Sequence, residues 1–141
     1  MIYADTSALV KRYLEEPFST EFDALFQQGA MAISRLTVVE LRCALARRRR
    51  NREIDALREN RINAEFATDI QDGALHLGSV GDADFTAAYH LIGRLADLSL
   101  RSLDALHLAA AEQIGASAFA TADKTQADVA AALGFTVHRF Y

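Results

Sequence analysis

The sequence predicts one α/β domain over residues 1–141, in which a parallel five-stranded sheet is flanked by about seven helices. Three observations predict it: short apolar runs alternate with longer amphipathic stretches, 51% of the residues are hydrophobic, and no repeat or low-complexity linker interrupts the chain. A chain of this length buries a core without disulfides or structural metal. Strands separated by helices require right-handed crossovers, which place helices on both faces of a parallel sheet.

The first residues predict a strand that is followed directly by a helix. Residues 2–4 form a short apolar run that stops at Asp5, and Thr6 opens an apolar-periodic stretch that reaches Leu14. In a parallel sheet, ligands bind beyond the C-terminal ends of the strands. Asp5 is therefore the first candidate site residue, although an aspartate at this position also serves as a helix N-cap.

The alternation continues after Pro17. Gly29 closes an amphipathic stretch, because glycine is the preferred residue just beyond a helix end. Thr37 begins the next long helix, and Asn51 breaks it. These signals predict, in order, a helix over 20–28, a strand over 31–34, and helices over 37–50 and 53–70.

Glycine residues and caps also delimit the second half of the chain. Gly73 leads into an apolar run, Gly81 and Ser102 precede helical stretches, and Gly115 and Gly134 end them. The elements expected from these signals are strands over 74–80, 116–121 and 135–139, and helices over 83–98, 103–114 and 124–133.

Composition and charge exclude several classes of protein. The lone Cys43 has no partner for a disulfide or a zinc site, and its Ala/Leu-rich surroundings predict a small core side chain. Neither a signal peptide nor a bilayer-spanning apolar run is present, so we expect a soluble cytoplasmic protein without membrane contact. The net charge of −4 argues against nonspecific coating of nucleic acid. No glycine-rich phosphate loop indicates a nucleotide-binding enzyme.

Three further acids recur at positions equivalent to that of Asp5. Glu40 lies one turn into the helix after the second strand, Asp104 lies in the first turn of the helix before the fourth strand, and Asp123 directly follows that strand. All four would face one edge of the sheet. Each also has a local explanation. Glu40 would pair with Thr37 in a capping box, Asp104 would be a first-turn acid favoured by the helix dipole, and Asp123 would be a helix N-cap. Caps alone do not explain why acids gather there, because Ser, Thr or Asn would cap equally well.

A cluster of four carboxylates needs a compensating cation, because like charges held together repel. An all-oxygen ligand set with few His or Cys residues favours Mg²⁺ or Mn²⁺ over zinc. Such an ion activates water and neutralises the charge that develops on a phosphodiester. The acids therefore predict hydrolytic phosphoryl chemistry that needs no nucleophilic side chain.

Nine arginines lie between Arg35 and Arg61. Such a run is typical of a phosphate-contacting arm, a docking surface for an acidic partner, or a solvated helix end. The solvated end is the commonest of the three. The arginine block at the centre of this run comprises Arg47, Arg48, Arg49, Arg50 and Arg52.

Four segments, in order and suitably spaced over essentially the whole chain, resemble the signatures of PIN-domain ribonucleases: residues 2–7 with Asp5, 34–41 with Glu40, 102–109 with Asp104, and 121–124 with Asp123. Within that family the short single-domain form is similar to VapC toxins of bacterial and archaeal toxin–antitoxin pairs. The resemblance implies a Rossmann-like PIN fold, Mg²⁺- or Mn²⁺-dependent cleavage of RNA, usually a homodimer, and inhibition by a small cognate antitoxin of the VapB type. By motif position, the implied catalytic and metal-site residues are Asp5, Glu40, Asp104 and Asp123, and the implied supporting polar residues are Thr6, Ser7 and Thr121.

The leading hypothesis is a metal-dependent endoribonuclease toxin in which metal-activated water cleaves RNA. The alternative is a non-catalytic module that binds RNA or a partner through Arg47 to Arg52. A phosphatase with an aspartyl nucleophile ranks last, because Ser7 stands where such enzymes usually have a second aspartate. His107, one turn beyond Asp104, is expected to be structural, and Asp128 is expected on a solvated helix face.

Overall fold

The structure is a computed structural model that describes residues 1–141. None of its helices combines the length and the apolarity that crossing a bilayer requires. Its five strands and seven helices are, in order, β1 (Ile2–Ala4), α1 (Thr6–Tyr13), α2 (Ser19–Phe26), β2 (Met31–Ser34), α3 (Arg35–Arg50), α4 (Ala56–Gln71), β3 (Leu75–Gly78), α5 (Asp82–Arg94), α6 (Ser102–Ile114), β4 (Ala118–Thr121), α7 (Lys124–Ala132) and β5 (Thr136–Arg139).

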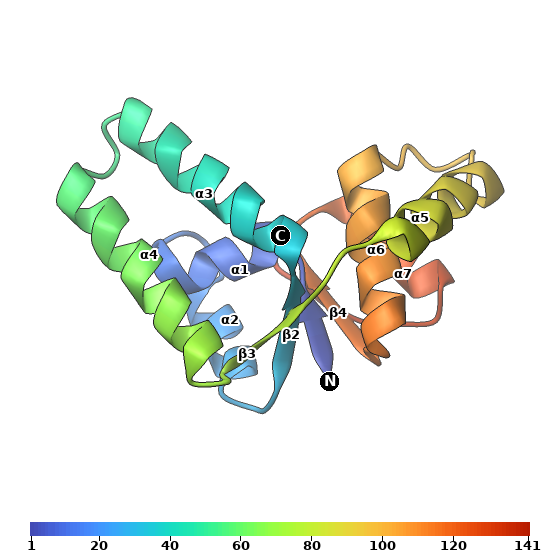
Figure 1. Cartoon of the computed structure of the whole chain (residues 1–141), viewed down its shortest axis with the longest axis horizontal. Helices are drawn as coiled ribbons and strands as arrows, with labels where there is room; N and C mark the ends of the chain where they lie inside the picture. The colour runs from blue at the N-terminus through green and yellow to red at the C-terminus, as the bar shows by residue number, and fades with distance from the viewer.

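All five strands lie parallel in one sheet, in the order β3-β2-β1-β4-β5 (Figure 1). Helices connect every pair of strands that follow each other in the chain. The predicted α/β fold with a five-stranded parallel sheet and seven helices is therefore confirmed. Because β1 is central and pairs with β2 and β4, the C-terminal ends of these three strands meet at one edge.

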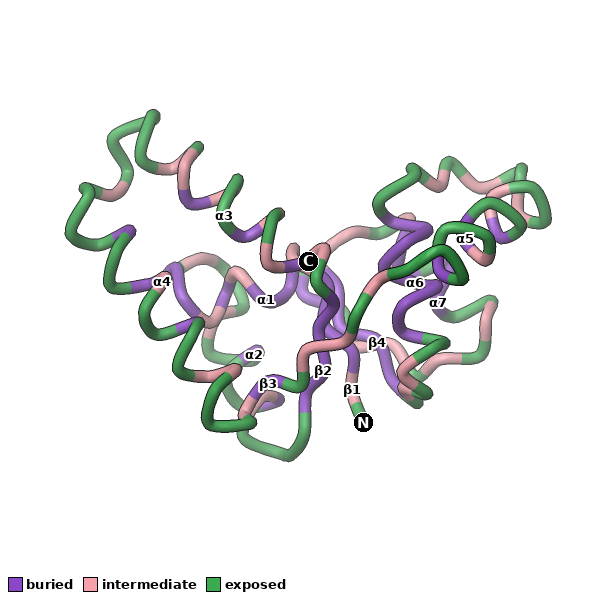
Figure 2. Tube along the Cα trace, in the orientation of Figure 1, coloured by how far each residue is buried: buried purple, intermediate pink, exposed green.

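Helices cover both faces of the sheet, with α1 to α4 on one side and α5 to α7 on the other (Figure 1). Each side has its own hydrophobic core, and the central strands between them are buried (Figure 2). Successive strand residues point to opposite faces. Tyr3 therefore packs on Phe119 in the core under α6, while Ala4 belongs to the core that contains Leu9 and Phe22.

The start of α3 differs from the prediction. The helix begins at Arg35, with Ser34 as its N-cap residue, so it starts two residues before Thr37. The expected capping box between Thr37 and Glu40 is therefore wrong. Thr37 is buried inside the helix and its hydroxyl has no hydrogen-bond partner. Because β2 passes directly into α3, the last strand residue takes the cap position.

Two other local predictions are wrong. Ser102 is the first residue of α6, and Arg101 before it is the N-cap residue, without a side-chain cap hydrogen bond. Cys43 is exposed and lies outside the core. Leu41 and Leu45 set the buried face of α3, and a residue midway between them points to the opposite side of a helix. The Ala/Leu-rich composition around Cys43 did not reveal this helical phase.

Candidate active site

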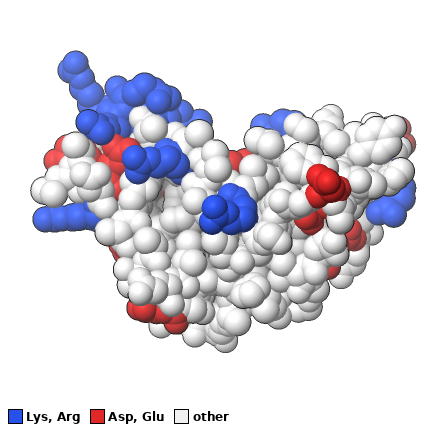
Figure 3. Space-filling model, in the orientation of Figure 1, with Lys and Arg blue, Asp and Glu red and all other residues white.

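A cleft of about 700 Å³ opens at the C-terminal edge of the sheet. It lies where β1, β2 and β4 end, and Figure 3 shows this side as a hollow between two raised arms of the molecule. The structure brings all four predicted acids, which come from four separate segments of the chain, to the lining of this cleft: Asp5, Glu40, Asp104 and Asp123.

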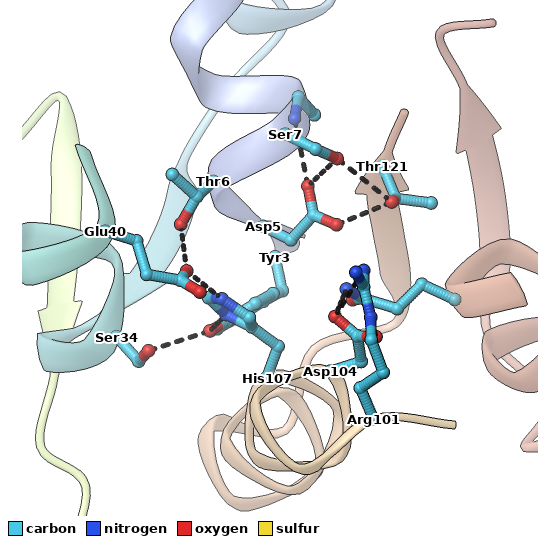
Figure 4. Close-up of polar contacts among 12 residues, drawn as sticks. Tyr3, Asp5, Thr6, Ser7, Ser34, Glu40, Arg101, Asp104, His107 and Thr121 are labelled. Atoms are coloured by element: carbon cyan, nitrogen blue, oxygen red, sulfur yellow. Dashed lines mark hydrogen bonds and ion pairs between the residues drawn. The ribbon is translucent and has the colours of Figure 1, made fainter. Parts of the chain in front are cut away.

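Asp5 follows β1 directly and is only 1% exposed. Its Oδ1 accepts hydrogen bonds from the Ser7 hydroxyl (2.7 Å) and the Ala8 N–H (2.9 Å), and its Oδ2 accepts one from the Thr121 hydroxyl (2.5 Å; Figure 4). Asp5 is thus also the N-cap of α1. Burial raises the pKa of Asp5, opposed by the charge of His107 and by these hydrogen bonds. No Lys or Arg pairs with this carboxylate, so its charge lacks a cationic partner within hydrogen-bond reach.

The three predicted supporting hydroxyl groups divide between two acids. Ser7 and Thr121 donate to Asp5, whereas Thr6 donates to Glu40 (Figure 4). The hydroxyl oxygens of Ser7 and Thr121 also accept backbone N–H groups from the loop after β4, at 2.8 and 3.0 Å. These bonds tie the end of β4 to the start of α1 and limit the rotation of the Asp5 carboxylate.

A buried histidine holds Glu40. His107, which is 2% exposed, places Nε2 2.6 Å from Glu40 Oε2 and Nδ1 2.7 Å from the Tyr3 hydroxyl. Tyr3 in turn donates to Ser34 Oγ at 2.9 Å, so a continuous polar chain crosses the core (Figure 4). Burial alone would raise the pKa of Glu40. The hydrogen bond and charge of His107, the hydrogen bond of Thr6 and the charge of Arg101 together hold this pKa below its usual value. His107 is thus a structural brace for an acid of the cleft.

Arg101 joins the other two acids. Its Nε donates to Asp104 Oδ2 at 2.8 Å (Figure 4). Its Nη2 lies 3.3 Å from Asp123 Oδ2. The hydrogen bond with Asp104 is the main reason why the pKa of Arg101 lies above its usual value. Gln126 supports both acids from α7: its amide donates to Asp104 Oδ1 at 2.9 Å, and its N–H donates to Asp123 Oδ1 at 2.8 Å.

The chemistry of the acids fits a hard divalent cation, although they are not gathered around one point. No three His, Cys, Asp or Glu side chains converge closely enough to enclose an ion. Asp104 and Asp123 contact Arg101, and Glu40 contacts His107. Carboxylate oxygens are the ligands that Mg²⁺ and Mn²⁺ prefer. The fourth acid, Asp5, is buried and has no cation bonded to it, which supports the fit of a divalent cation.

The arginine block forms one wall of the cleft, at the far end of α3, where basic side chains gather in Figure 3. Arg47, Arg48 and Arg50 line the cleft. Arg48 pairs with two glutamates, and Arg49 pairs with a glutamate of α4, which leaves Arg47, Arg50 and Arg52 without an ion pair. The block is therefore partly a brace between helices and partly a free basic surface beside the acids.

Sequence reasoning missed Arg101 and Tyr3 as members of the site. The Arg101–Asp104 spacing of three residues places two side chains on one helix face, so this pair was accessible from the sequence. Tyr3 instead had the pattern of an apolar strand residue, because its partner His107 is remote in the chain. Asp128 is exposed and lies outside the cleft lining, as predicted.

Comparison with known proteins identifies the fold. The model of the PIN domain family matches residues 2–132. Among solved structures, VapC20 of Mycobacterium tuberculosis, a sarcin–ricin loop cleaving toxin, is 18% identical with a TM-score of 0.74, covering 96% of this chain and 97% of that chain. FitAcB of Neisseria gonorrhoeae is 17% identical with a TM-score of 0.71, covering 97% and 96%.

A toxin–antitoxin complex of Klebsiella pneumoniae contains a chain that is 16% identical with a TM-score of 0.68, covering 100% of this chain and 98% of that chain. At such identities the similarity concerns the fold. No curated protein matches the sequence. Because the family model spans nearly all of the sequence, the chain belongs to the PIN domain family.

Proposed function

We propose that the chain is a Mg²⁺- or Mn²⁺-dependent endoribonuclease that acts as the toxin of a toxin–antitoxin pair. One observation supports this most strongly. The buried Asp5 carboxylate has no cation bonded to it and shares a cleft with three further acids, in a PIN domain. The structural similarity to VapC20, a sarcin–ricin loop cleaving toxin, favours RNA as the substrate class.

The proposed site divides the chemistry between the ion and the chain. A bound ion would lower the pKa of water and offset the negative charge of the phosphodiester. Ser7 and Thr121 donate to the two oxygens of the Asp5 carboxylate. His107 contacts Oε2 of Glu40, so both carboxylates present fixed orientations. Asp5, Glu40 and Asp104 would hold the first ion. Asp123 would complete this site or hold a second ion.

The proposed partners are an antitoxin of the VapB type and a second copy of the chain, in the cytoplasm. The similar Klebsiella structure is a toxin–antitoxin complex, which supports the antitoxin. Phe85 and Tyr89 on α5 are 58% and 75% exposed. Large apolar side chains exposed on one helix are typical of an interface, which supports a homodimer.

RNA cleavage by the purified protein tests the proposed activity. In Mg²⁺ or Mn²⁺ the protein is expected to cut bulk RNA internally, and excess EDTA is expected to stop cleavage until the ion is restored. RNA 5′ and 3′ end mapping distinguishes endonucleolytic cuts from trimming. RNA or partner binding that EDTA leaves unchanged, without cleavage in any ion, would instead support the non-catalytic module that uses Arg47 to Arg52.

Arg47 and Arg50 are proposed to bind RNA phosphates that flank the scissile bond. Both line the cleft without an ion pair, so their guanidinium groups are free to contact RNA. The association constant K for single-stranded RNA falls as the salt concentration rises. Changing both arginines to glutamine is expected to make the slope of log K against log[salt] less steep by about 1.4, since each phosphate contact contributes about 0.7. Fluorescence anisotropy in EDTA measures this slope without cleavage.

The matched control changes Arg61 and Arg94 to glutamine. These two arginines are exposed, make no ion pair and lie outside the cleft lining, and the double change alters the net charge equally. An equal loss of slope in both double variants would show a long-range charge effect and contradict direct phosphate contacts by Arg47 and Arg50.

A further inference from the structure

Arg101 is the only Lys or Arg side chain that pairs with any of the four acids of the cleft. Its guanidinium uses Nε for Asp104 Oδ2 at 2.8 Å (Figure 4). It uses Nη2 for Asp123 Oδ2 at 3.3 Å. A single positive group thus spans two carboxylates that come from different helices. Each of these oxygens is a preferred ligand of a hard divalent cation. Arg101 and an ion would therefore contact the same atoms.

The ion pairs of Arg101 can break at little cost in stability. Its side chain is 73% exposed, and its N-cap position in α6 uses only the backbone, without a side-chain cap hydrogen bond. Ion pairs of such exposed, flexible side chains contribute little to stability. Moving the guanidinium into solvent would therefore disturb neither the start of α6 nor the packed core.

The two acids, in contrast, are held in place without Arg101. Asp104 is 10% exposed at its side chain and accepts the Gln126 amide at 2.9 Å, and Asp123 accepts the Gln126 N–H as the cap of α7. Both bonds use Oδ1, whereas Arg101 makes its shortest contact to each acid at Oδ2. The oxygens that Arg101 would release are therefore available on acids whose positions are already set.

We propose that Arg101 is a displaceable counter-cation of this site, which pairs with Asp104 and Asp123 and yields them to a divalent ion. The proposal rests on the proposed function, since it takes the acids to be the ion site. It gives Asp104 and Asp123 a cationic partner that competes with the ion for their Oδ2 atoms. Arg101 thereby lowers the affinity of the site for the ion.

Direct measurement of Mn²⁺ binding tests this competition. The EPR signal of free Mn²⁺ is recorded during titration of the EDTA-treated, dialysed protein, for the wild type, Arg101→Gln and Arg94→Gln. Arg94 is exposed on α5, makes no ion pair and lies outside the cleft lining, so both variants change the net charge equally. Circular dichroism melting checks that each variant is folded.

Arg101→Gln is expected to lower the Kd for Mn²⁺ about three- to tenfold, which is the effect of losing one or two exposed ion pairs. Arg94→Gln is expected to leave the Kd within about twofold of the wild type, because its charge is remote and screened. Equal Kd values for the wild type and Arg101→Gln, or weaker binding by that variant, would overturn the proposal and leave the nuclease proposal standing. Absence of Mn²⁺ binding in every protein would overturn both.

A second measurement follows Arg101 itself in the wild type. Its Nε–H donates to Asp104, so hydrogen exchange at this group, observed by NMR, is expected to speed up when Mg²⁺ is added. Unchanged exchange at saturating Mg²⁺ would show that the guanidinium stays in place, which would overturn the proposal.

Discussion

The Asp5→Asn variant is expected to lose RNA cleavage by at least about 10³-fold while keeping its fold. A catalytic ion contributes several kcal/mol of charge stabilisation, and about 4 kcal/mol corresponds to 10³-fold in rate. Asparagine keeps an oxygen for the Ala8 N–H, and its amide can donate to the Thr121 hydroxyl. Asparagine caps helices as well as aspartate does, so α1 retains its start.

The same variant is expected to be more stable than the wild type in EDTA at neutral pH. Burial raises the pKa of Asp5, so the folded chain holds this proton more tightly than the unfolded chain does. The free energy of unfolding of the wild type therefore falls as the pH rises from the usual value of 3.8 through the raised pKa. Asp5→Asn does not lose stability in this way. The free energies of unfolding of the two proteins are therefore expected to diverge only at pH values above 3.8. Urea unfolding at a series of pH values measures the difference.

Asp128→Asn is the matched control for Asp5→Asn. Asp128 is an exposed acid of α7 outside the cleft lining, so its substitution is expected to change neither cleavage nor the pH dependence of unfolding. Full cleavage by Asp5→Asn would show that Asp5 does not hold the catalytic ion. Loss of the fold in that variant would reduce the role of Asp5 to helix capping.

His107→Ala is expected to lower kcat about 10- to 100-fold and to destabilise the fold by about 2–4 kcal/mol. Groups that orient a metal-binding side chain typically affect metal affinity or activity by that factor. The stability loss combines a cavity in the core with a Tyr3 hydroxyl and a Glu40 carboxylate that lose a partner. Initial-rate kinetics and urea unfolding measure the two effects.

The ion dependence of His107→Ala separates positioning from packing. If His107 orients Glu40, the Mn²⁺ concentration for half-maximal rate is expected to rise, KM for RNA to stay near its wild-type value, and excess Mn²⁺ to restore part of kcat. His90→Ala, at an exposed position of α5, is expected to change none of these values. A loss of kcat with unaltered Mn²⁺ dependence would show that His107 only fills the core.

The sheet and the edge that carries the cleft were predictable because local signals were strong. An apolar run that ends at Asp5, and a second that ends shortly before Asp123, fix where two strands stop, and parallel crossovers bring those ends together. Glycine residues after the helices predicted where those helices end. Gly115, for example, adopts the left-handed conformation that suits glycine at the end of α6. The four acids reached one cleft for this reason.

The features that were not predictable depend on contacts between remote segments. The phase of α3, which exposes Cys43, depends on which face meets the core, and the composition around it does not determine that face. The Tyr3–His107 bond joins the first strand to α6, and neither residue signals the other. The acids also carry no sign of the Arg101 side chain that spans two of them, because the Arg101–Asp123 pair forms only through tertiary geometry.

Anomalous diffraction from crystals soaked in Mn²⁺ tests the ion site most directly. We predict a peak within about 2.5 Å of a carboxylate oxygen of Asp5 and of an oxygen of at least one of its three acidic neighbours in the cleft. Soaked crystals of Asp5→Asn are expected to lack this peak. A wild-type cleft without a peak, in crystals of protein that cleaves RNA in Mn²⁺, would contradict an ion held by these acids.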